Sequence, residues 1–155
     1  MTKHLTGAEL AEAIERSVPG SVAEVQPQGV VIQAESIPAV AAFLHDDPGF
    51  AFDFLASLTA VDYLDYFEVV YHLTSLIYNH SAVLRTRAYG RTAPVVPSVV
   101  AVWRGADFQE REAWDLMGVR FEGHPDLRRI LMWEEFQGHP MRKDYVPEDQ
   151  NALER

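Results

Sequence analysis

Residues 67–88, FEVVYHLTSLIYNHSAVLRTRA, decide the fold class, because they contain two consecutive segments with the composition of β-strands. The first, residues 67–73, is rich in valine and tyrosine, which are enriched in strands. In the second, residues 77–88, small or apolar side chains alternate with larger, partly charged ones, as in a strand with one face toward solvent. Another strand-like run, residues 52–63, precedes both. The middle of the chain therefore predicts three consecutive strands.

The segment before these strands predicts a helix followed by a hairpin. Thr6 and Glu9 have the spacing of a capping box, and the helix that they begin ends at Pro19-Gly20. The β-rich runs 22–26 and 30–34 flank a short turn that contains proline and glycine, which is typical of a hairpin.

Two further helices complete the prediction, one beginning at Ser36 and one covering residues 106–117 with Gly118 just after its last turn. The order helix, two strands, helix, three strands indicates an α+β fold with two layers, in which helices cover a mixed or largely antiparallel sheet. After the third helix regular patterning fades, and we call residues 121–145 the strap, because we expect them to be extended.

The expected organisation has three parts. Residues 1–105 form an α+β domain, residues 106–146 form a signature helix and an extended partner-binding segment, and residues 147–155 form a loose tail. An irregular segment as long as the strap either binds a partner or is disordered, and its apolar content favours binding.

Composition excludes several functions. The formal net charge of −10 argues against nucleic-acid binding, which depends on neutralising phosphates with Lys and Arg. The absence of cysteine excludes disulfides, thiolate zinc sites and the usual ligation of iron–sulfur clusters. No apolar run reaches 18 residues and no signal-peptide core follows Met1, so we expect neither a membrane span nor secretion.

Motifs of common enzymes are also absent. There is no Gly-x-Gly-x-x-Gly, no Gly-x-x-x-x-Gly-Lys and no Gly-x-Ser-x-Gly in the chain. Asp62, at the end of a predicted strand, is interpreted as a cap of that strand rather than as part of a carboxylate cluster. We therefore predict no catalytic, cofactor-binding or metal-binding residue in this chain.

The tripeptide Gly-His-Pro occurs twice, at 123–125 and 138–140. Two histidines, with Asp126 or Asp144, could form the metal site of a stand-alone metallohydrolase. Their spacing lacks the close ligand pair usual in zinc sites, so we favour two tight turns in which each histidine makes local hydrogen bonds.

Glu110 lies within the apolar stripe of the third helix, where an unpaired charge would be too costly. It could be a general acid or base with a raised pKa. We favour a structural carboxylate that pairs with Arg128 or Arg129. On another flank of the same helix, Arg111 and Asp115 have the spacing of an i,i+4 ion pair.

Basic residues are concentrated near the C-terminus, since 7 of the 13 Lys and Arg residues lie between 104 and 145. They are interleaved with aromatic residues such as Trp133 and Tyr145, and arginine with aromatics is the composition of a protein-interface anchor.

Three stretches carry a resemblance to a known family: EREAWDLMGV from Glu110, FEGHPDLRRIL from Phe121, and GHPMRKDY from Gly138. They closely resemble the C subunit, or 30-kilodalton subunit family, of bacterial respiratory complex I, the NADH:quinone oxidoreductase. LTAVDYLD at 58–65 and FEVVYHLTS at 67–75 are also similar to that family, so the resemblance covers most of the chain. Met117 stands where many relatives have an aromatic residue, and many members extend further or are fused to the D subunit.

The resemblance implies an α+β subunit of the peripheral arm with no flavin, iron–sulfur cluster or quinone ligand of its own; FMN and iron–sulfur clusters belong to other subunits. It implies a non-redox scaffold on the cytoplasmic side of the bacterial membrane that contacts the D and B subunits. Arginines of the strap would donate paired bonds to partner groups. The alternative that the resemblance leaves open is the equivalent scaffold of an energy-converting hydrogenase or another quinone reductase.

The residues that match the family's signature form the predicted partner interface. They are Glu110, Arg111, Asp115, His124, Pro125, Asp126, Arg128, Arg129, His139, Pro140, Arg142, Lys143, Asp144 and Tyr145, with Glu112, Gly118, Leu127, Ile130 and Gly138 in the same motifs.

Overall fold

The structure is a computed structural model that describes residues 1–147. In chain order its elements are β1 (Lys3–His4), α1 (Gly7–Ser17), β2 (Val22–Gln26), β3 (Gly29–Ile32), the 3-10 turn η1 (Ala34–Ser36), α2 (Ile37–Asp46), β4 (Phe54–Asp62), β5 (Tyr66–Ser75), β6 (His80–Tyr89), β7 (Val95–Pro97), α3 (Ala106–Met117) and β8 (Arg120–Glu122). The chain is thus an α+β fold, as the order of elements predicted.

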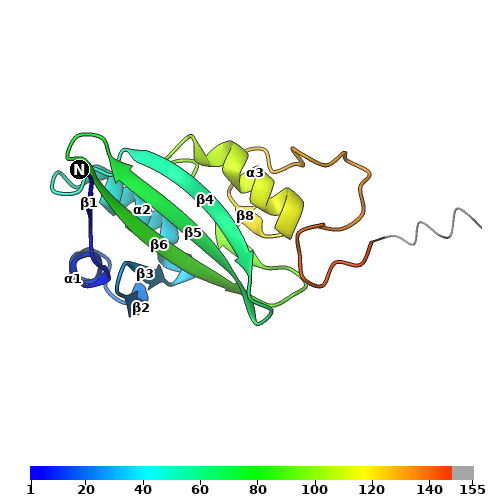
Figure 1. Ribbon diagram of the computed structural model, residues 1–155, viewed down its shortest axis with the longest axis horizontal. Helices are drawn as coiled ribbons and strands as arrows, with labels where there is room; N and C mark the ends of the chain where they lie inside the picture. The colour runs from blue at the N-terminus through cyan, green and yellow to red at the C-terminus, as the bar shows by residue number, and fades with distance from the viewer. Residues whose placement is uncertain (148–155) are drawn as a thin grey trace, which may run out of the picture.

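The main sheet is mixed. Its strands lie in the order β2-β3-β6-β5-β4, with β1 beside β6 (Figure 1). The pairs β2–β3, β4–β5 and β5–β6 are antiparallel, whereas β3 and β1 run parallel to β6. The two strands within residues 67–88, β5 and β6, therefore lie inside the sheet, and β2 and β4 form its edges.

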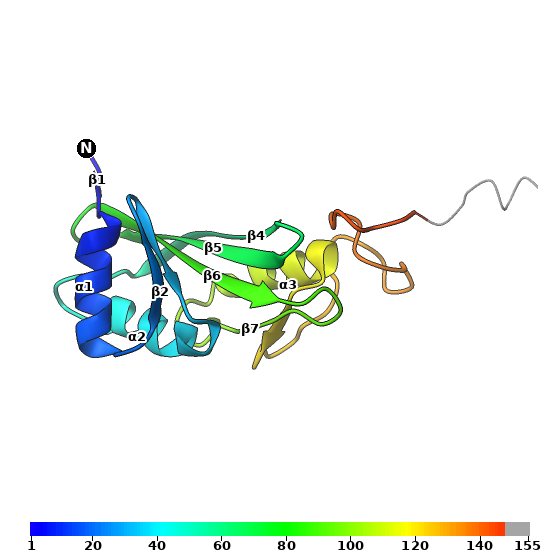
Figure 2. The same ribbon diagram turned by 90° about the horizontal axis from the view of Figure 1, so that it is seen from below.

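One face of the sheet is buried. Along β5 and β6, alternate residues such as Phe67, Tyr71 and Leu84 are buried, and the side chains between them are mostly more exposed. Helices α2 and α3 lie on one side of the sheet (Figure 2), and residues of all three helices belong to one hydrophobic core. This arrangement is the two-layer structure that the sequence predicted.

Helix α1 begins as expected. The Thr6 hydroxyl accepts a hydrogen bond from the Glu9 N–H (3.2 Å), and the Glu9 carboxylate accepts one from the Thr6 N–H (2.8 Å). Two of the helix's first free N–H groups are thereby satisfied. The predicted capping box is confirmed.

Helix α3 spans residues 106–117, as predicted, and Gly118 adopts φ of 75° immediately after it. Ala106, Ala113 and Met117 pack into the same hydrophobic core as the sheet. Packing therefore joins α3 to the preceding residues, while the strap that follows is connected to that body mainly through polar bonds.

Some boundaries differ from the sequence prediction. The strand expected at 77–88 begins only at His80, because Asn79 takes a left-handed φ of 52° in the turn after β5. The strand expected at 30–34 ends at Ile32, and residues 34–36 form a 3-10 turn before α2. The small parallel pair of β7 and β8 was not predicted, since a three-residue strand leaves almost no periodicity in sequence.

Within residues 1–147, no helix combines the length and the apolar character that a bilayer crossing requires. Of the predicted tail 147–155, residues 148–155 lie outside the described residues.

The cap of α1 is open to a simple test. Thr6→Ala removes the hydroxyl acceptor, so we expect the free energy of unfolding to fall by about 1 kcal/mol in urea denaturation. Thr92→Ala is the control, because the described residues give this exposed threonine no side-chain hydrogen bond, and it should stay within about 0.5 kcal/mol of the parent. Equal losses in both variants would contradict a stabilising cap.

Candidate functional site

The strap follows helix α3 from its first turn to its last. His124 bonds the carbonyl of Asp107 near the start of the helix, and Met141 donates its N–H to the carbonyl of Leu116 near the end. Figure 1 shows the strap leaving β8, extending beyond the C-terminal end of α3 and turning back toward it. The segment predicted to bind a partner is therefore first attached to this chain's own helix.

Asp115 is the main attachment point. Its Oδ2 accepts hydrogen bonds from the N–H groups of Ile130 (3.1 Å), Leu131 (2.7 Å) and Met132 (2.9 Å), and its Oδ1 accepts one from Arg129 Nη1 (2.7 Å). The carboxylate is fully buried. Burial alone would raise the pKa of Asp115, but the three N–H donors and the guanidinium together hold the pKa below its ordinary value.

Arg111 makes the complementary attachment. Its Nε donates to the carbonyl of Arg128 (3.2 Å) and its Nη2 to the carbonyl of Arg129 (3.0 Å). The predicted i,i+4 bridge between Arg111 and Asp115 is wrong for the described structure, because both side chains bind the strap instead. Backbone groups of an irregular segment need partners when they are shielded from water, and these two residues supply an acceptor and a donor for them.

The first Gly-His-Pro turn secures the start of the strap. Gly123 has φ of 85°, a left-handed conformation that favours glycine. The His124 side chain is fully buried; its Nδ1 accepts the Asp126 N–H (2.9 Å), and its Nε2 donates to the Asp107 carbonyl (3.1 Å). Both ring nitrogens are thus used in attaching the strap to α3.

The second Gly-His-Pro turn attaches the strap to the other end of the helix in the same way, through a left-handed glycine and a histidine that bonds a helix carbonyl. Gly138 also has φ of 85°, and His139 Nδ1 lies 2.9 Å from the carbonyl oxygen of Asp115. The His139 ring packs against Trp114 with 4.9 Å between ring centroids. A side chain at Gly118 would place its Cβ 2.7 Å from that ring, so the close approach requires glycine. The prediction of local bonds is confirmed only for His124, through the Asp126 N–H; the bond that joins each histidine to a carbonyl of α3 spans 17 or 24 residues. No group of three potential metal ligands occurs within residues 1–147.

Glu110 is buried but does not pair with an arginine. Its carboxylate accepts hydrogen bonds from the Ser98 hydroxyl (2.6 Å) and the Val99 N–H (2.8 Å), and His124 Nε2 lies 4.0 Å away. The predicted pairing with Arg128 or Arg129 is therefore wrong. Burial raises the pKa of Glu110, and these donors only partly oppose the effect. The group connects α3 to the segment after β7.

The end of the strap is attached to the sheet. Arg91, just after β6, donates to both oxygens of Asp62 at the end of β4 (2.6 and 2.8 Å) and pairs with Asp144 (3.0 Å). Arg142 also donates to both oxygens of Asp144 (2.9 and 3.0 Å), and the Lys143 N–H donates to Asp62 (2.9 Å). Sequence reasoning missed Arg91 and the second role of Asp62, because these groups lie far apart along the chain.

The remaining predicted interface residues are more exposed. Pro125 is exposed, Arg128 forms a surface pair with Asp126 (2.8 Å), and Tyr145 stacks on Phe136 with centroids 6.1 Å apart. Pro140 follows His139 in the second turn and is half-buried. Whether any of these residues meets a partner stays a prediction.

Large apolar side chains also lie on the outer surface of the strap. Leu131, Trp133 and Met141 have exposed fractions of 59%, 62% and 63%. Their backbone is fixed by Asp115 and by the turns on either side, so these side chains are displayed at set positions. Arg129 and Arg142, expected to bind a partner, donate to acceptors of this chain.

Comparisons with known proteins agree on one family. Residues 30–151 match the model of the family described as respiratory-chain NADH dehydrogenase, 30 kDa subunit. The C subunit of NADH-quinone oxidoreductase from Roseiflexus sp. (strain RS-1) is 42% identical over 147 residues, which is 90% of this chain and 84% of that protein. The C 2 subunit of the same enzyme from Rhizobium meliloti (strain 1021) is 47% identical over 117 residues, 74% of this chain and 63% of that protein.

A solved structure shares the fold. A chain in the structure of the membrane-bound sulfane sulfur reductase, an archaeal respiratory membrane complex, superposes with a TM-score of 0.73 at 24% identity, covering 95% of this chain and 88% of that chain. The fold and the matches define the class as a subunit type of respiratory-chain enzyme complexes. Within that class, the chain belongs to the 30-kDa subunit family of respiratory-chain NADH dehydrogenase.

The role of Asp115 can be tested by Asp115→Asn. The amide removes the charge and leaves too few acceptors for three N–H groups and Arg129, so we expect unfolding to become easier by about 2 kcal/mol or more. Amide exchange at residues 129–132 should accelerate at the same time. Asp126→Asn, which breaks only an exposed pair, is the control and should change stability by no more than about 0.5 kcal/mol. Unchanged exchange at 129–132 in Asp115→Asn would exclude this attachment.

The charges at the end of the strap predict its response to acid. The Arg142 guanidinium lowers the pKa of Asp144 from 3.8 to about 2, and Arg91 lowers the pKa of Asp62 well below its usual range. A carboxyl with a depressed pKa in the folded state stabilises that state above its ordinary pKa, and the stabilisation is lost as pH falls toward the folded value. We therefore expect amide protection at residues 141–145 to decline between pH 3.8 and about 2.

Glu110 gives the opposite sign, because its raised pKa means that protonation is easier in the folded state. Amides near Ser98 and Val99 should therefore keep their protection through the same titration. Hydrogen exchange read by mass spectrometry at several pH values measures both regions. Simultaneous loss at both would indicate general acid unfolding and contradict a local release of the strap.

Proposed function

We propose that this chain is a non-redox structural subunit in the peripheral arm of a proton-pumping NADH:quinone oxidoreductase. In that enzyme electrons pass from NADH through FMN and iron–sulfur clusters of other subunits to quinone, and their transfer is coupled to proton translocation. The single observation that carries the proposal is the strap: it is attached along α3 by buried polar groups and presents Leu131, Trp133 and Met141 outward.

The chemistry of the chain supports a scaffold rather than a redox centre. Iron–sulfur clusters are held by cysteine thiolates in most proteins, and this chain has no cysteine. The two histidines that could suggest a metallohydrolase bond carbonyls of α3. Their positions fit turns that fix the strap, and FMN and the clusters are assigned to the partners.

The partners that we propose are the D and B subunits, on the cytoplasmic side of the bacterial membrane. Apolar and aromatic side chains anchor many protein interfaces, and a cluster held by a rigid backbone loses little entropy on binding. Residues 106–146 act in this proposal as the partner-binding segment. Arg128, which is exposed and forms a surface pair with Asp126, is available at the rim to exchange partners.

Leu131→Ser combined with Trp133→Ser tests the proposal. Both side chains are exposed in the chain itself, so the variant should remain folded but lose contact area with the partner subunits. We expect its co-purification with the B and D subunits from native membranes to fall at least tenfold, which corresponds to loss of about 1.4 kcal/mol of binding. NADH:quinone activity of the isolated complex should fall in parallel.

Leu76→Ser with Ile77→Ser is the matched control, because these apolar residues are equally exposed (68% and 69%) in the turn between β5 and β6. Figure 1 shows this turn at the opposite end of the sheet from the strap. Equal retention of both double variants would refute the strap as the interface. Co-purification with a hydrogenase instead of an NADH:quinone oxidoreductase would show that the chain is a scaffold subunit of that other class of complex.

A further inference from the structure

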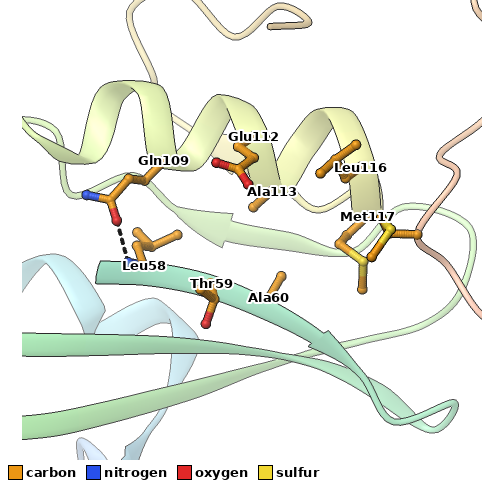
Figure 3. A pocket seen from close by; sticks show the side chains of 9 residues that line it. Leu58, Thr59, Ala60, Gln109, Glu112, Ala113, Leu116 and Met117 are labelled. Carbon is orange, nitrogen blue, oxygen red and sulfur yellow. Dashed lines mark hydrogen bonds between the residues drawn. The ribbon is translucent and has the colours of Figure 1, made fainter. Parts of the chain in front are cut away.

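A groove of about 170 Å³ lies between strand β4 and helix α3. Its lining is mainly apolar and includes Leu58, Ala60, Ala113, Leu116, Met117 and Met141. Figure 3 shows α3 running above β4 in the same direction, with Gln109 near Leu58 and Met117 beyond Ala60. The groove is open at the surface, and the strap borders it at Met141, whose N–H bonds the Leu116 carbonyl.

Strand β4 brings an unpaired edge to this groove. Among the strands of residues 1–147 it is the last of the main sheet and pairs only with β5. The Leu58 N–H points away from β5, since it donates to Gln109 Oε1 (2.6 Å). Successive residues of a strand alternate the direction of their backbone groups, so the N–H and C=O of Ala60 point the same way. Within residues 1–147, no side chain accepts a bond from the Ala60 N–H.

Gln109 shows how an edge is protected where no strand is added. Its side-chain oxygen takes the place of a neighbouring carbonyl at Leu58, and its amide nitrogen donates to the Gly105 carbonyl (3.0 Å). Two residues further along β4, at Ala60, no side chain of residues 1–147 takes the place of a neighbouring carbonyl. A free edge beside apolar surface is a site for pairing with another extended chain.

One charge borders the groove. Glu112 borders the groove from α3 (Figure 3), and no Lys, Arg or His of residues 1–147 comes within ion-pair distance of its carboxylate. Leu116 follows Glu112 by four residues, which places the two side chains about 6 Å apart along the helix axis. Along an extended chain, side chains on one face recur every two residues, about 7 Å apart.

We propose that an extended segment of a partner subunit docks on this groove by adding to the edge of β4 at Ala60. An apolar side chain of that segment enters between Leu116 and Met117, and a Lys or Arg two residues away on the same face pairs with Glu112. The distance between Glu112 and Leu116 along the helix is close to the distance between side chains two residues apart on one face of a strand. The docking segment should therefore contain an apolar residue and a Lys or Arg separated by one residue. The inference rests on the proposed function, since the occupant belongs to another subunit of the complex.

A photoreactive benzoylphenylalanine at Thr59, an exposed residue of the groove, tests the proposal in the assembled complex. We expect it to cross-link one short segment of another subunit that contains an apolar residue and a Lys or Arg spaced by two. The same probe at His72, exposed on the open face of β5, is the control and should not capture that segment.

Two variants separate the contacts. Ala60→Pro removes the free N–H at an edge where proline is tolerated, and Glu112→Lys reverses the charge without touching the backbone. Each should reduce the Thr59 cross-link at least about fivefold, the effect of one lost hydrogen bond or ion pair. Glu35→Lys, at an exposed position of the 3-10 turn η1 and outside the partner-binding segment, controls for the change in net charge and should leave the yield unchanged.

The outcomes are distinct. If the chain co-purifies with the NADH:quinone oxidoreductase but Thr59 captures only residues of its own chain, a helical surface or nothing, the groove proposal is overturned and the proposed function stands. A cross-link insensitive to Glu112→Lys and Ala60→Pro also overturns it. Failure of the unsubstituted chain to co-purify with that complex overturns both.

Discussion

The carboxylate of Asp115 is the interaction on which the C-terminal third depends. Residues 123–147 form no helix or strand, so their backbone groups lack the partners that regular structure provides. Three consecutive N–H groups of the strap converge on one Asp115 oxygen, and Arg129 takes the other. A single side chain thereby gives an irregular segment a defined position. The bends on either side, at Gly123 and Gly138, then determine where the strap begins and where it returns.

Glu110 and Asp115 show how neighbouring turns of one helix produce opposite electrostatics. Both carboxyls are completely buried. Glu110 receives one hydroxyl and one N–H, which compensate poorly for desolvation, and its pKa is raised. Asp115 receives three N–H groups and a guanidinium, and its pKa is lowered. At each carboxyl, burial raises the pKa and hydrogen-bond donors lower it, and the balance of the two effects decides the sign. Asp115 therefore serves as a charged anchor, whereas Glu110 is a buried link between α3 and the segment after β7.

Much of the fold follows from local sequence, and much of the site does not. The Thr6–Glu9 cap, the hairpin around Pro27 and the exact extent of α3 depend on residues within a few positions of each other, so their signals survive in the chain. The i,i+4 spacing of Arg111 and Asp115 was correctly observed but misread, because spacing on a helix says nothing about a third segment that competes for both groups. Arg91 and Asp62 form a bond between the ends of β6 and β4, and no local sequence pattern predicts that bond.

Helix α3 meets three different surroundings, and this explains why its sequence is neither simply amphipathic nor simply polar. Ala106, Glu110 and Met117 face the core, Arg111 and Asp115 bind the strap, and Gln109, Glu112 and Leu116 border the groove beside β4. An ordinary surface helix divides its residues between core and solvent. Here the solvent side is divided again, between the attached strap and the groove, where the part of the chain that the structure describes leaves the Glu112 carboxylate without an ion pair and the edge of β4 without a neighbouring strand. A rigid helix that fixes both surfaces relative to the sheet can hold a partner at two places at once, which is the geometric requirement for a brace.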